Sequence, residues 1–165
     1  MMTIVGSRSE KVLSLTRGQW SSLLSELAKR GRGSRESGAF LLADKTGGRK
    51  ARAIVYLDDL DPNCLTGGIT FKGTAYSRLW DICSAKHMTV IADVHTHPGR
   101  AVAQSDIDQD NPMISQVGHV AIIIPSYARG KIKTRDIGVH IYRGDAGWDS
   151  WFRKDAARLV ELTWW

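Results

Sequence analysis

The chain has 165 residues, of which 42% are hydrophobic and 24% are charged, a balance that excludes a disordered or fibrous protein. We expect one soluble domain over residues 1–165, because a chain of this length buries about two-thirds of the surface it exposes when unfolded. No apolar run approaches the roughly 20 residues of a membrane span, and the start MMTIVGSRSE lacks the pattern of a secretory signal. We therefore expect a cytoplasmic location.

The net charge of +6 favours an acidic partner, either a protein or a nucleic acid, without deciding between them. Two clusters of positive charge lie beside expected turns, in residues 29–35 and 49–52, and we interpret both as a solvated rim. The two cysteines, Cys64 and Cys83, lack a C-x-x-C spacing. We interpret them as buried thiols and not as a disulfide or as zinc ligands.

A short strand and a long helix are predicted at the start of the chain. The strand is expected at residues 11–15, and Thr16 with Gln19 then has the spacing of a capping box, in which side chains satisfy free backbone N–H groups. Gly31 supplies a stop for the helix. The apolar stripe of this helix consists of Trp20, Leu23, Leu24 and Leu27.

The middle of the chain predicts three strands and a second helix. Two short apolar runs, 39–43 and 51–57, flank the loop sequence DKTGGRK and are expected to be adjacent strands. Residues 65–72 are predicted to form another strand. Residues 74–87 are predicted to form a helix, because their apolar residues recur at helical spacing.

The last part of the chain supplies most of the expected core. Aromatic and aliphatic residues over 148–160 predict a closing helix, and Trp164 and Trp165 are expected to pack on the core, with a contact surface as the alternative. Core strands are predicted in three segments rich in β-branched residues, 89–94, 120–124 and 137–142.

The residues that indicate chemistry lie in the segment VHTHP, followed by GRAVAQ and SDID. Side chains alternate across a strand, so His95 and His97 point to the same side and can converge on one ion. Pro98 then ends the strand. On a helical turn that begins at Ser105, Ser105 and Asp108 share one face and can lie toward the histidines.

Two neutral imidazoles and one carboxylate leave a fourth tetrahedral position for water, which is typical of a catalytic zinc site. His95, His97 and Asp108 are therefore the candidate ligands. Such a site also needs a base to accept a proton, and the sequence offers several acids. Asp93 shares the face of the two histidines and is a candidate to hold a ligand imidazole from behind.

Each of these residues also has a structural interpretation. Ser105 and Asp108 fit a capping box variant, and the histidine pair fits an exposed polar strand face. The joint spacing favours the metal site over these alternatives. Three other histidines fit no ligand spacing and are interpreted as structural, namely His87, His119 and His140.

The combined pattern consists of Glu36, the His-x-His-Pro motif, a six-residue gap and the Ser-x-x-Asp motif. With this pattern the sequence resembles the JAMM family of zinc metalloproteases, the catalytically competent MPN domains. The resemblance covers nearly the whole chain and implies an α/β domain with the MPN (cytidine-deaminase-like) fold, a curved mixed sheet flanked by helices. It implies that His95, His97 and Asp108 hold one Zn²⁺ per chain. It also implies that Glu36 is the general acid/base and that Ser105 hydrogen-bonds the oxyanion, with a solvated loop acid as the alternative for Glu36.

The implied activity is hydrolysis of the bond after the C-terminal glycine of a ubiquitin-like protein, either as an isopeptidase or as a processing protease. Small stand-alone members of the family imply E1-like and E2-like operon partners, antiphage defence operons among them. An extended tail would suit a narrow groove at a free sheet edge, for which residues 60–73 are the candidate. The rival is a non-catalytic MPN interaction module or a basic nucleic-acid-binding protein of RadC type; we expect neither a membrane nor nucleic acid as partner.

Overall fold

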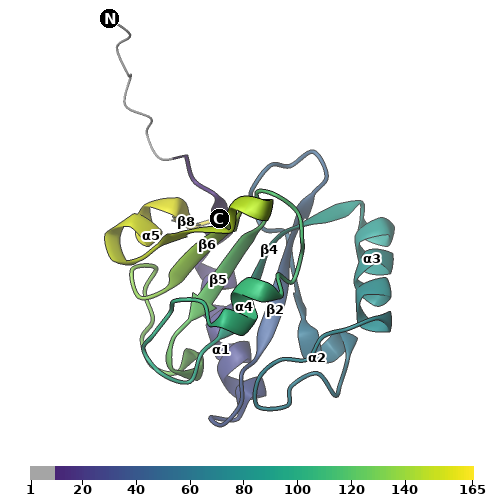
Figure 1. The fold of residues 1–165 in the computed structure, drawn as a ribbon. Coiled ribbons are helices and arrows are strands. Elements are labelled where there is room, and N and C mark those ends of the chain that lie inside the picture. Colours follow the sequence, from purple (N-terminus) through teal and green to yellow (C-terminus); the bar gives the residue numbers. More distant parts are fainter. Residues whose placement is uncertain (1–9) are drawn as a thin grey trace, which may run out of the picture.

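Residues 10–165 are described by a computed structural model, in which helices surround a six-stranded and a two-stranded sheet (Figure 1). The first elements are β1 (Leu13–Thr16), α1 (Arg17–Gly31), β2 (Gly38–Asp44), β3 (Ala53–Tyr56), α2 (Leu57–Leu60), α3 (Thr74–Lys86) and β4 (Met88–Thr96). The later elements are α4 (Asp106–Asp110), β5 (Val120–Ile124), η1 (Ser126–Ala128), β6 (Gly138–Tyr142), η2 (Gly144–Ala146), β7 (Trp148–Trp151), α5 (Arg153–Leu159) and β8 (Val160–Thr163). Within residues 10–165, no helix has the length and apolar character needed to cross a membrane.

The large sheet has the strand order β3-β2-β4-β5-β6-β7, and β1 pairs with β8 in the small sheet. β4 and β5 run parallel, whereas the other neighbours in the large sheet are antiparallel. The ends of β4 and β5 and the start of β2 therefore lie at one edge of the sheet. The HTHP segment and Glu36 adjoin this edge, which positions the candidate site.

The predicted first helix is confirmed. The Thr16 hydroxyl accepts from the Gln19 N–H at 3.0 Å, and the Gln19 side chain accepts from the Thr16 N–H at 2.8 Å. The helix ends at Gly31, and the left-handed residue that follows is Arg32, with a φ of 52°. The stripe lies against the core, with Trp20, Leu23 and Leu27 buried and Leu24 partly buried.

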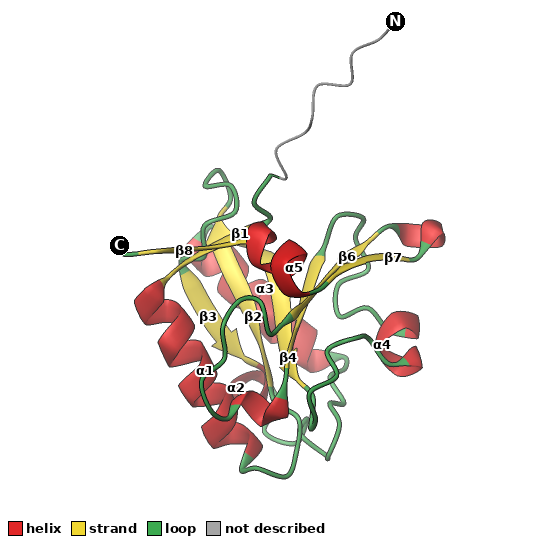
Figure 2. Ribbon diagram, turned by 90° about the vertical axis from the view of Figure 1, so that its left-hand side faces the viewer, coloured by secondary structure: helices red, strands yellow, loops and turns green. Residues whose placement is uncertain are grey.

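Helices cover both faces of the large sheet, with α1 in front of it and α3 behind it in Figure 2. Ala39 and Leu41 of β2 are buried on the α1 side, and Phe40 and Leu42 are buried on the α3 side. A strand that is covered on both faces has to be apolar throughout, as this run is. The expected α/β class, with a mixed sheet flanked by helices, is confirmed.

An irregularity in β4 decides which of its residues face the site. The register with β2 shifts so that Ile91 is an extra residue, and a bulge of this kind changes the alternation of side chains. Val90 packs with the core on the α3 side, whereas Ala92 packs on the α1 side. Asp93 and His95 consequently face the α3 side, where both line a groove.

The prediction of a strand over residues 65–72 is wrong. Gly67 has a φ of 106°, and the chain turns back so that Leu65 and Ile69 form an isolated bridge. The Thr66 N–H donates to the Gly68 carbonyl at 2.9 Å within this turn. Glycine at the turn permits the positive φ, and the segment is a loop beside the site.

The prediction of one closing helix over 148–160 is wrong in its first part. Residues Trp148–Trp151 form β7, which pairs with β6, and the helix is limited to Arg153–Leu159. Gly147, with a φ of 81°, turns the chain from β6 into β7. The spacing of the two tryptophans fits a helix, but the long-range pairing with β6 decides the structure.

The expectation that Trp164 and Trp165 pack on the core is also wrong. Their side chains are 75% and 87% exposed, because β8 ends at Thr163 and the chain runs past the small sheet. The Arg17 guanidinium lies 4.6 Å from the centre of the Trp164 ring. These residues therefore belong to the surface.

Candidate metal centre

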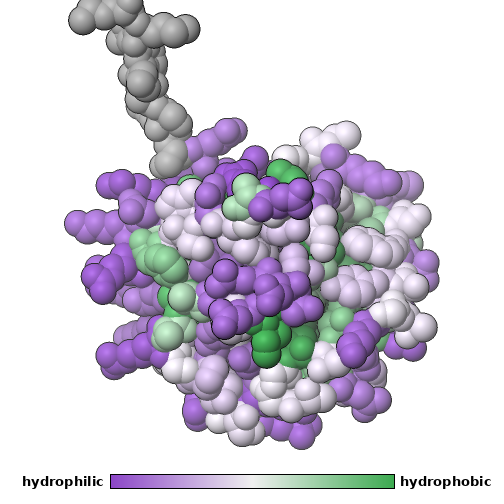
Figure 3. All heavy atoms as spheres, in the orientation of Figure 1, coloured by the Kyte–Doolittle hydropathy of each residue, from purple (hydrophilic) through white to green (hydrophobic). Residues whose placement is uncertain are grey.

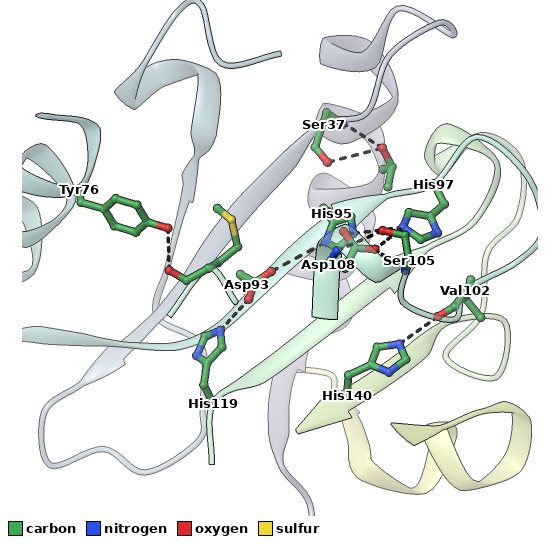
Figure 4. Close-up of polar contacts among 12 residues, drawn as sticks. Ser37, Tyr76, Asp93, His95, His97, Val102, Ser105, Asp108, His119 and His140 are labelled. Carbon is green, nitrogen blue, oxygen red and sulfur yellow. Dashed lines mark hydrogen bonds and ion pairs between the residues drawn. The ribbon is translucent and has the colours of Figure 1, made fainter. Parts of the chain in front are cut away.

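His95, His97 and Asp108 point toward one another at the end of β4 (Figure 4). The two Nε2 atoms are 3.2 Å apart. Asp108 places one carboxylate oxygen 3.2 Å from Nε2 of His97 and the other 3.4 Å from Nε2 of His95. The three residues expected as ligands therefore form one cluster.

The spacing of these atoms fits a tetrahedral metal ion. Zinc bonds of about 2.0–2.1 Å place neighbouring tetrahedral ligand atoms about 3.3 Å apart. The 3.2 Å between the two Nε2 atoms agrees with this value, and each Nε2 atom has a different oxygen of the Asp108 carboxylate at 3.2 to 3.4 Å. Two nitrogens and one carboxylate oxygen are also ligands that zinc prefers, so the cluster could bind a metal ion.

Two glycines lie in the row of the sheet that contains His95. Gly38, His95, Ile123 and Gly138 form one row across β2, β4, β5 and β6. A Cβ atom on Gly38 would lie 2.7 Å from a Leu57 methyl and 2.8 Å from the Val94 carbonyl oxygen. The small residue therefore lets the neighbouring chain approach the ligand strand closely.

The loop after β4 fixes the orientation of His97. Its Nδ1 lies 3.1 Å from the Ala101 carbonyl oxygen. A carbonyl can only accept, so Nδ1 carries a proton, and Nε2 is the nitrogen that faces Asp108 and that a metal would bind.

Asp93 and His119 lie behind His95. Asp93 is 2% exposed, and its Oδ1 accepts a hydrogen bond from Nε2 of His119 at 2.6 Å. Its Oδ2 is 3.9 Å from Nδ1 of His95, which is close enough for attraction but longer than a hydrogen bond. Burial alone would raise the pKa of Asp93, but the hydrogen bond from His119 and the attraction of the nearby His95 outweigh burial and lower it.

In the absence of a metal, attraction between opposite charges sets the direction of the pKa shifts in the cluster. Burial alone would lower the pKa of His95, but the carboxylates of Asp108 and Asp93 raise this pKa to about 10. Burial alone would raise the pKa of Asp108, but hydrogen bonds with His95 and His97 hold it well below its usual range. A cation at this point would take the place of the histidine proton.

Glu36 is held beside the cluster by its neighbours. Ser37 donates its hydroxyl to the Leu27 carbonyl at 2.7 Å and its N–H to the Thr96 hydroxyl at 3.0 Å. The Glu36 N–H donates to the Gly67 carbonyl at 2.8 Å. Burial raises the pKa of the Glu36 carboxyl, while the nearby His95 lowers it by less. A raised pKa suits a carboxylate that accepts a proton and returns it.

Ser105 is the N-cap of α4, so its structural interpretation holds in the fold. Its hydroxyl oxygen accepts from the Asp108 N–H at 3.1 Å, and the Asp108 carboxylate accepts from the Ser105 N–H at 2.8 Å. Because the oxygen acts as acceptor here, the hydroxyl proton remains free to be donated. The cap thus leaves a donor beside the groove while it orients the Asp108 carboxylate.

A groove of about 740 Å³ opens beside the cluster, between residues 66–72 and 104–115. Glu36, His95 and Ser105 are among its polar lining residues. In Figure 3 apolar side chains gather beside the hydrophilic residues of α4 on this face. Apolar residues that line the groove are Ile69, Phe71, Ile107, Met113 and Trp148.

The other histidines differ in their position. His87 is exposed and follows α3 with a φ of 53°. His119 and His140 are buried and bond to groups around the cluster, namely Asp93 and the Val102 carbonyl. Neither link has a local signal in the sequence, because both depend on partners at least 26 residues away.

Fold and site together define an α/β domain with a candidate metal centre of two histidines and one aspartate. No known protein-family model matches the chain. A Desulfitobacterium hafniense protein of known solution structure is similar in fold, with a TM-score of 0.62, 16% identity and coverage of 91% of this chain and 92% of that one. A Salinibacter ruber protein has a TM-score of 0.57 and 15% identity over 90% and 91% of the two chains.

A JAB1/MPN domain protein from Archaeoglobus fulgidus has a TM-score of 0.45 and 18% identity over 96% of this chain and 98% of that chain. The two bacterial structures support the fold alone, and the third similarity is too weak to add to it.

Proposed function

We propose that this protein is a zinc-dependent hydrolase of peptide or isopeptide bonds. One observation carries the proposal: His95, His97 and Asp108 converge with metal-ligand spacing beside a groove that is lined by Glu36 and Ser105. When bound, zinc supplies Lewis acidity, which makes water a stronger acid and a carbonyl a better electrophile.

Glu36 and Ser105 supply the proton transfer and the oxyanion contact. The Glu36 carboxylate accepts a proton from the attacking water and returns it to the departing amine nitrogen. The Ser105 hydroxyl donates to the carbonyl oxygen as negative charge develops there. Burial of Glu36 supports its role, because it raises the pKa of the carboxyl toward the working pH.

The proposed substrate is the C-terminal tail of a ubiquitin-like protein, free as a precursor or joined to an amine. The groove lies between two loop segments, 66–72 and 104–115, and its apolar walls suit an extended chain. Glycine at the scissile bond has no side chain and would let the backbone approach the cluster closely. The resemblance in the motif spacing also makes E1-like and E2-like proteins the proposed operon partners.

The proposal is tested with a ubiquitin-like protein from the same gene neighbourhood, fused through its terminal glycine to a reporter. Zinc-loaded protein is expected to cut after that glycine, as shown by mass spectrometry, and a chelator should stop the reaction. Asp108→Asn should lose activity. Asp106→Asn is the matched control, because Asp106 lies on the same helix and is not part of the cluster.

Binding of the fusion protein without any cleavage by the zinc-loaded chain would contradict the proposal and favour the non-catalytic interaction module. Equal activity of Asp108→Asn and Asp106→Asn would remove Asp108 from the site.

A further inference from the structure

The loop between β4 and α4 is tethered at two adjacent carbonyls. Among the hydrogen bonds within residues 10–165, two reach the backbone of residues 100–103. His97 holds the Ala101 carbonyl at 3.1 Å, and His140 holds the Val102 carbonyl at 2.9 Å. One tether therefore starts from a candidate ligand and the other from the sheet.

His140 is built for this contact. It is fully buried in β6, directly opposite Ser150 of β7, and its Nδ1 lies 2.7 Å from the Ser150 hydroxyl. The Val102 carbonyl can only accept, so Nε2 of His140 must donate. Burial lowers the pKa of His140, which favours the neutral ring, and Nδ1 then accepts from the Ser150 hydroxyl. The bonds form a directed chain from Ser150 through His140 to Val102.

Gly138 provides the space that the Val102 carbonyl occupies. It lies two residues before His140 and on the same face of β6. A Cβ atom here would clash with the Val102 carbonyl oxygen and would lie 2.7 Å from Nε2 of His140. His140 thus supplies a hydrogen-bond donor for the Val102 carbonyl, and Gly138 separately supplies the space for it.

We propose that His140 is a positioning residue of the metal centre. It fixes the Val102 peptide, and the adjacent Ala101 carbonyl is thereby held against Nδ1 of His97, so that Nε2 faces the other ligands (Figure 4). The same tether holds the path of the chain toward Ser105 and Asp108. This inference rests on the proposed function only in that the centre binds zinc.

Zinc affinity and the cobalt spectrum test the proposal without a cleavage assay. His140→Leu removes both hydrogen bonds, whereas His140→Gln keeps a side-chain N–H near the position of Nε2. Gly138→Ala displaces the Val102 carbonyl without removing a polar group. Ile141→Ala is the matched control, because Ile141 is buried on the opposite face of the same strand.

Loss of groups that orient metal ligands typically weakens binding about 10- to 100-fold. We expect about tenfold weaker zinc binding in His140→Leu and Gly138→Ala, with a changed visible spectrum of the Co²⁺ form. His140→Gln should stay within about threefold of wild type, and Ile141→Ala should bind normally although it is less stable.

If His140→Leu does not fold, Gly138→Ala carries the test. Wild-type zinc affinity and cobalt spectrum in the folded His140→Leu or Gly138→Ala protein would overturn the inference. Equal weakening in Ile141→Ala would also overturn it, since the effect would then follow stability alone. Failure of wild type to bind zinc would overturn the proposed function instead.

Discussion

The two halves of the candidate centre are built differently. The strand half, Asp93 and His95, lies inside the sheet, and these residues are 2% and 9% exposed. The loop half, which consists of His97, Ser105 and Asp108, follows the end of β4 and includes the five-residue helix α4. No residue of α4 is buried, so packing against the core contributes little to the position of this half.

The strand half is held in position by the fold, whereas the loop half is held by single hydrogen bonds. Packing and strand pairing fix the strand half, and a ligand there has little freedom to move. A few polar contacts hold the loop half, among them the Ser105–Asp108 capping box and the His140 tether. Changes in the two halves should therefore affect stability and function unequally.

The largest effect is expected from removal of a ligand. His95→Ala and Asp108→Ala should both retain less than about a tenth of the zinc of wild type after dialysis, because three protein ligands are needed for the site. Both variants lose the attraction between His95 and Asp108, but only His95→Ala also removes a buried side chain, and it should therefore lower the free energy of unfolding of the metal-free protein further, by about 1–3 kcal/mol. Elemental analysis and urea unfolding in chelator measure the two quantities, and equal stability losses would contradict the division into halves.

Glu36→Gln is expected to slow turnover by about 10²- to 10⁴-fold, because it removes the group that accepts and returns the proton. Its volume hardly changes, and Glu36 is not a ligand, so zinc content should be unchanged. Single-turnover rates of the zinc-loaded protein on one substrate measure the effect. Equal rates in variant and wild type would show that another acid transfers the proton, and Asp93 would be the first to test.

Ser105→Ala should slow turnover by about 10²- to 10³-fold through loss of an oxyanion donor. It should also cost about 1 kcal/mol of local stability in α4, because the N-cap is lost. Ser105→Thr keeps the hydroxyl and the cap and should stay near the wild-type rate. A Thr variant as slow as the Ala variant would show that the loss does not come from the hydroxyl group.

Asp93→Asn should weaken zinc binding about tenfold, because a neutral amide replaces the carboxylate that faces His95 from behind. The variant keeps the shape of the side chain, so the fold should persist. Zinc titration against a chromophoric chelator measures the change. Unchanged affinity would mean that the distance of 3.9 Å is too long for Asp93 to influence the ligand.

A last prediction concerns pH and the metal-free protein. The carboxylates around His95 raise its pKa to about 10 in the folded state, above its value of about 6.5 in the unfolded chain. The attraction between protonated His95 and the carboxylates stabilises the folded protein. This stabilisation is fully present below the pKa of the unfolded chain and is lost as pH rises through the pKa of the folded protein. The free energy of unfolding in chelator should therefore fall between pH 7 and 10, more steeply in wild type than in His95→Ala. Parallel profiles would contradict the prediction.

Local patterns predicted the elements whose burial repeats with a regular period. The stripe of α1 and the apolar run of β2 are examples, because one face or both faces of each element meet the core. The predictions failed where distant pairing decides the structure. Trp148 and Trp151 have helical spacing, yet β6 pairs with this segment, and Trp164 lies beyond the last strand.

The candidate centre shows the same limit. His95, His97 and Asp108 could be predicted from the sequence because strand alternation and one helical turn bring them together. The contacts of Asp93 with His119 and of His140 with Val102 join segments 26 and 38 residues apart. Only the folded arrangement reveals these partners, because Val102 lies in the loop after β4 and His119 directly precedes β5.

X-ray absorption at the zinc edge of the purified, zinc-loaded protein tests the central claim most directly. We expect one zinc per chain with nitrogen and oxygen ligands at about 2.0–2.1 Å and the scattering pattern of two imidazoles. Zinc well below half an equivalent, or sulfur ligands at about 2.3 Å, would contradict the assignment of His95, His97 and Asp108 as the metal centre.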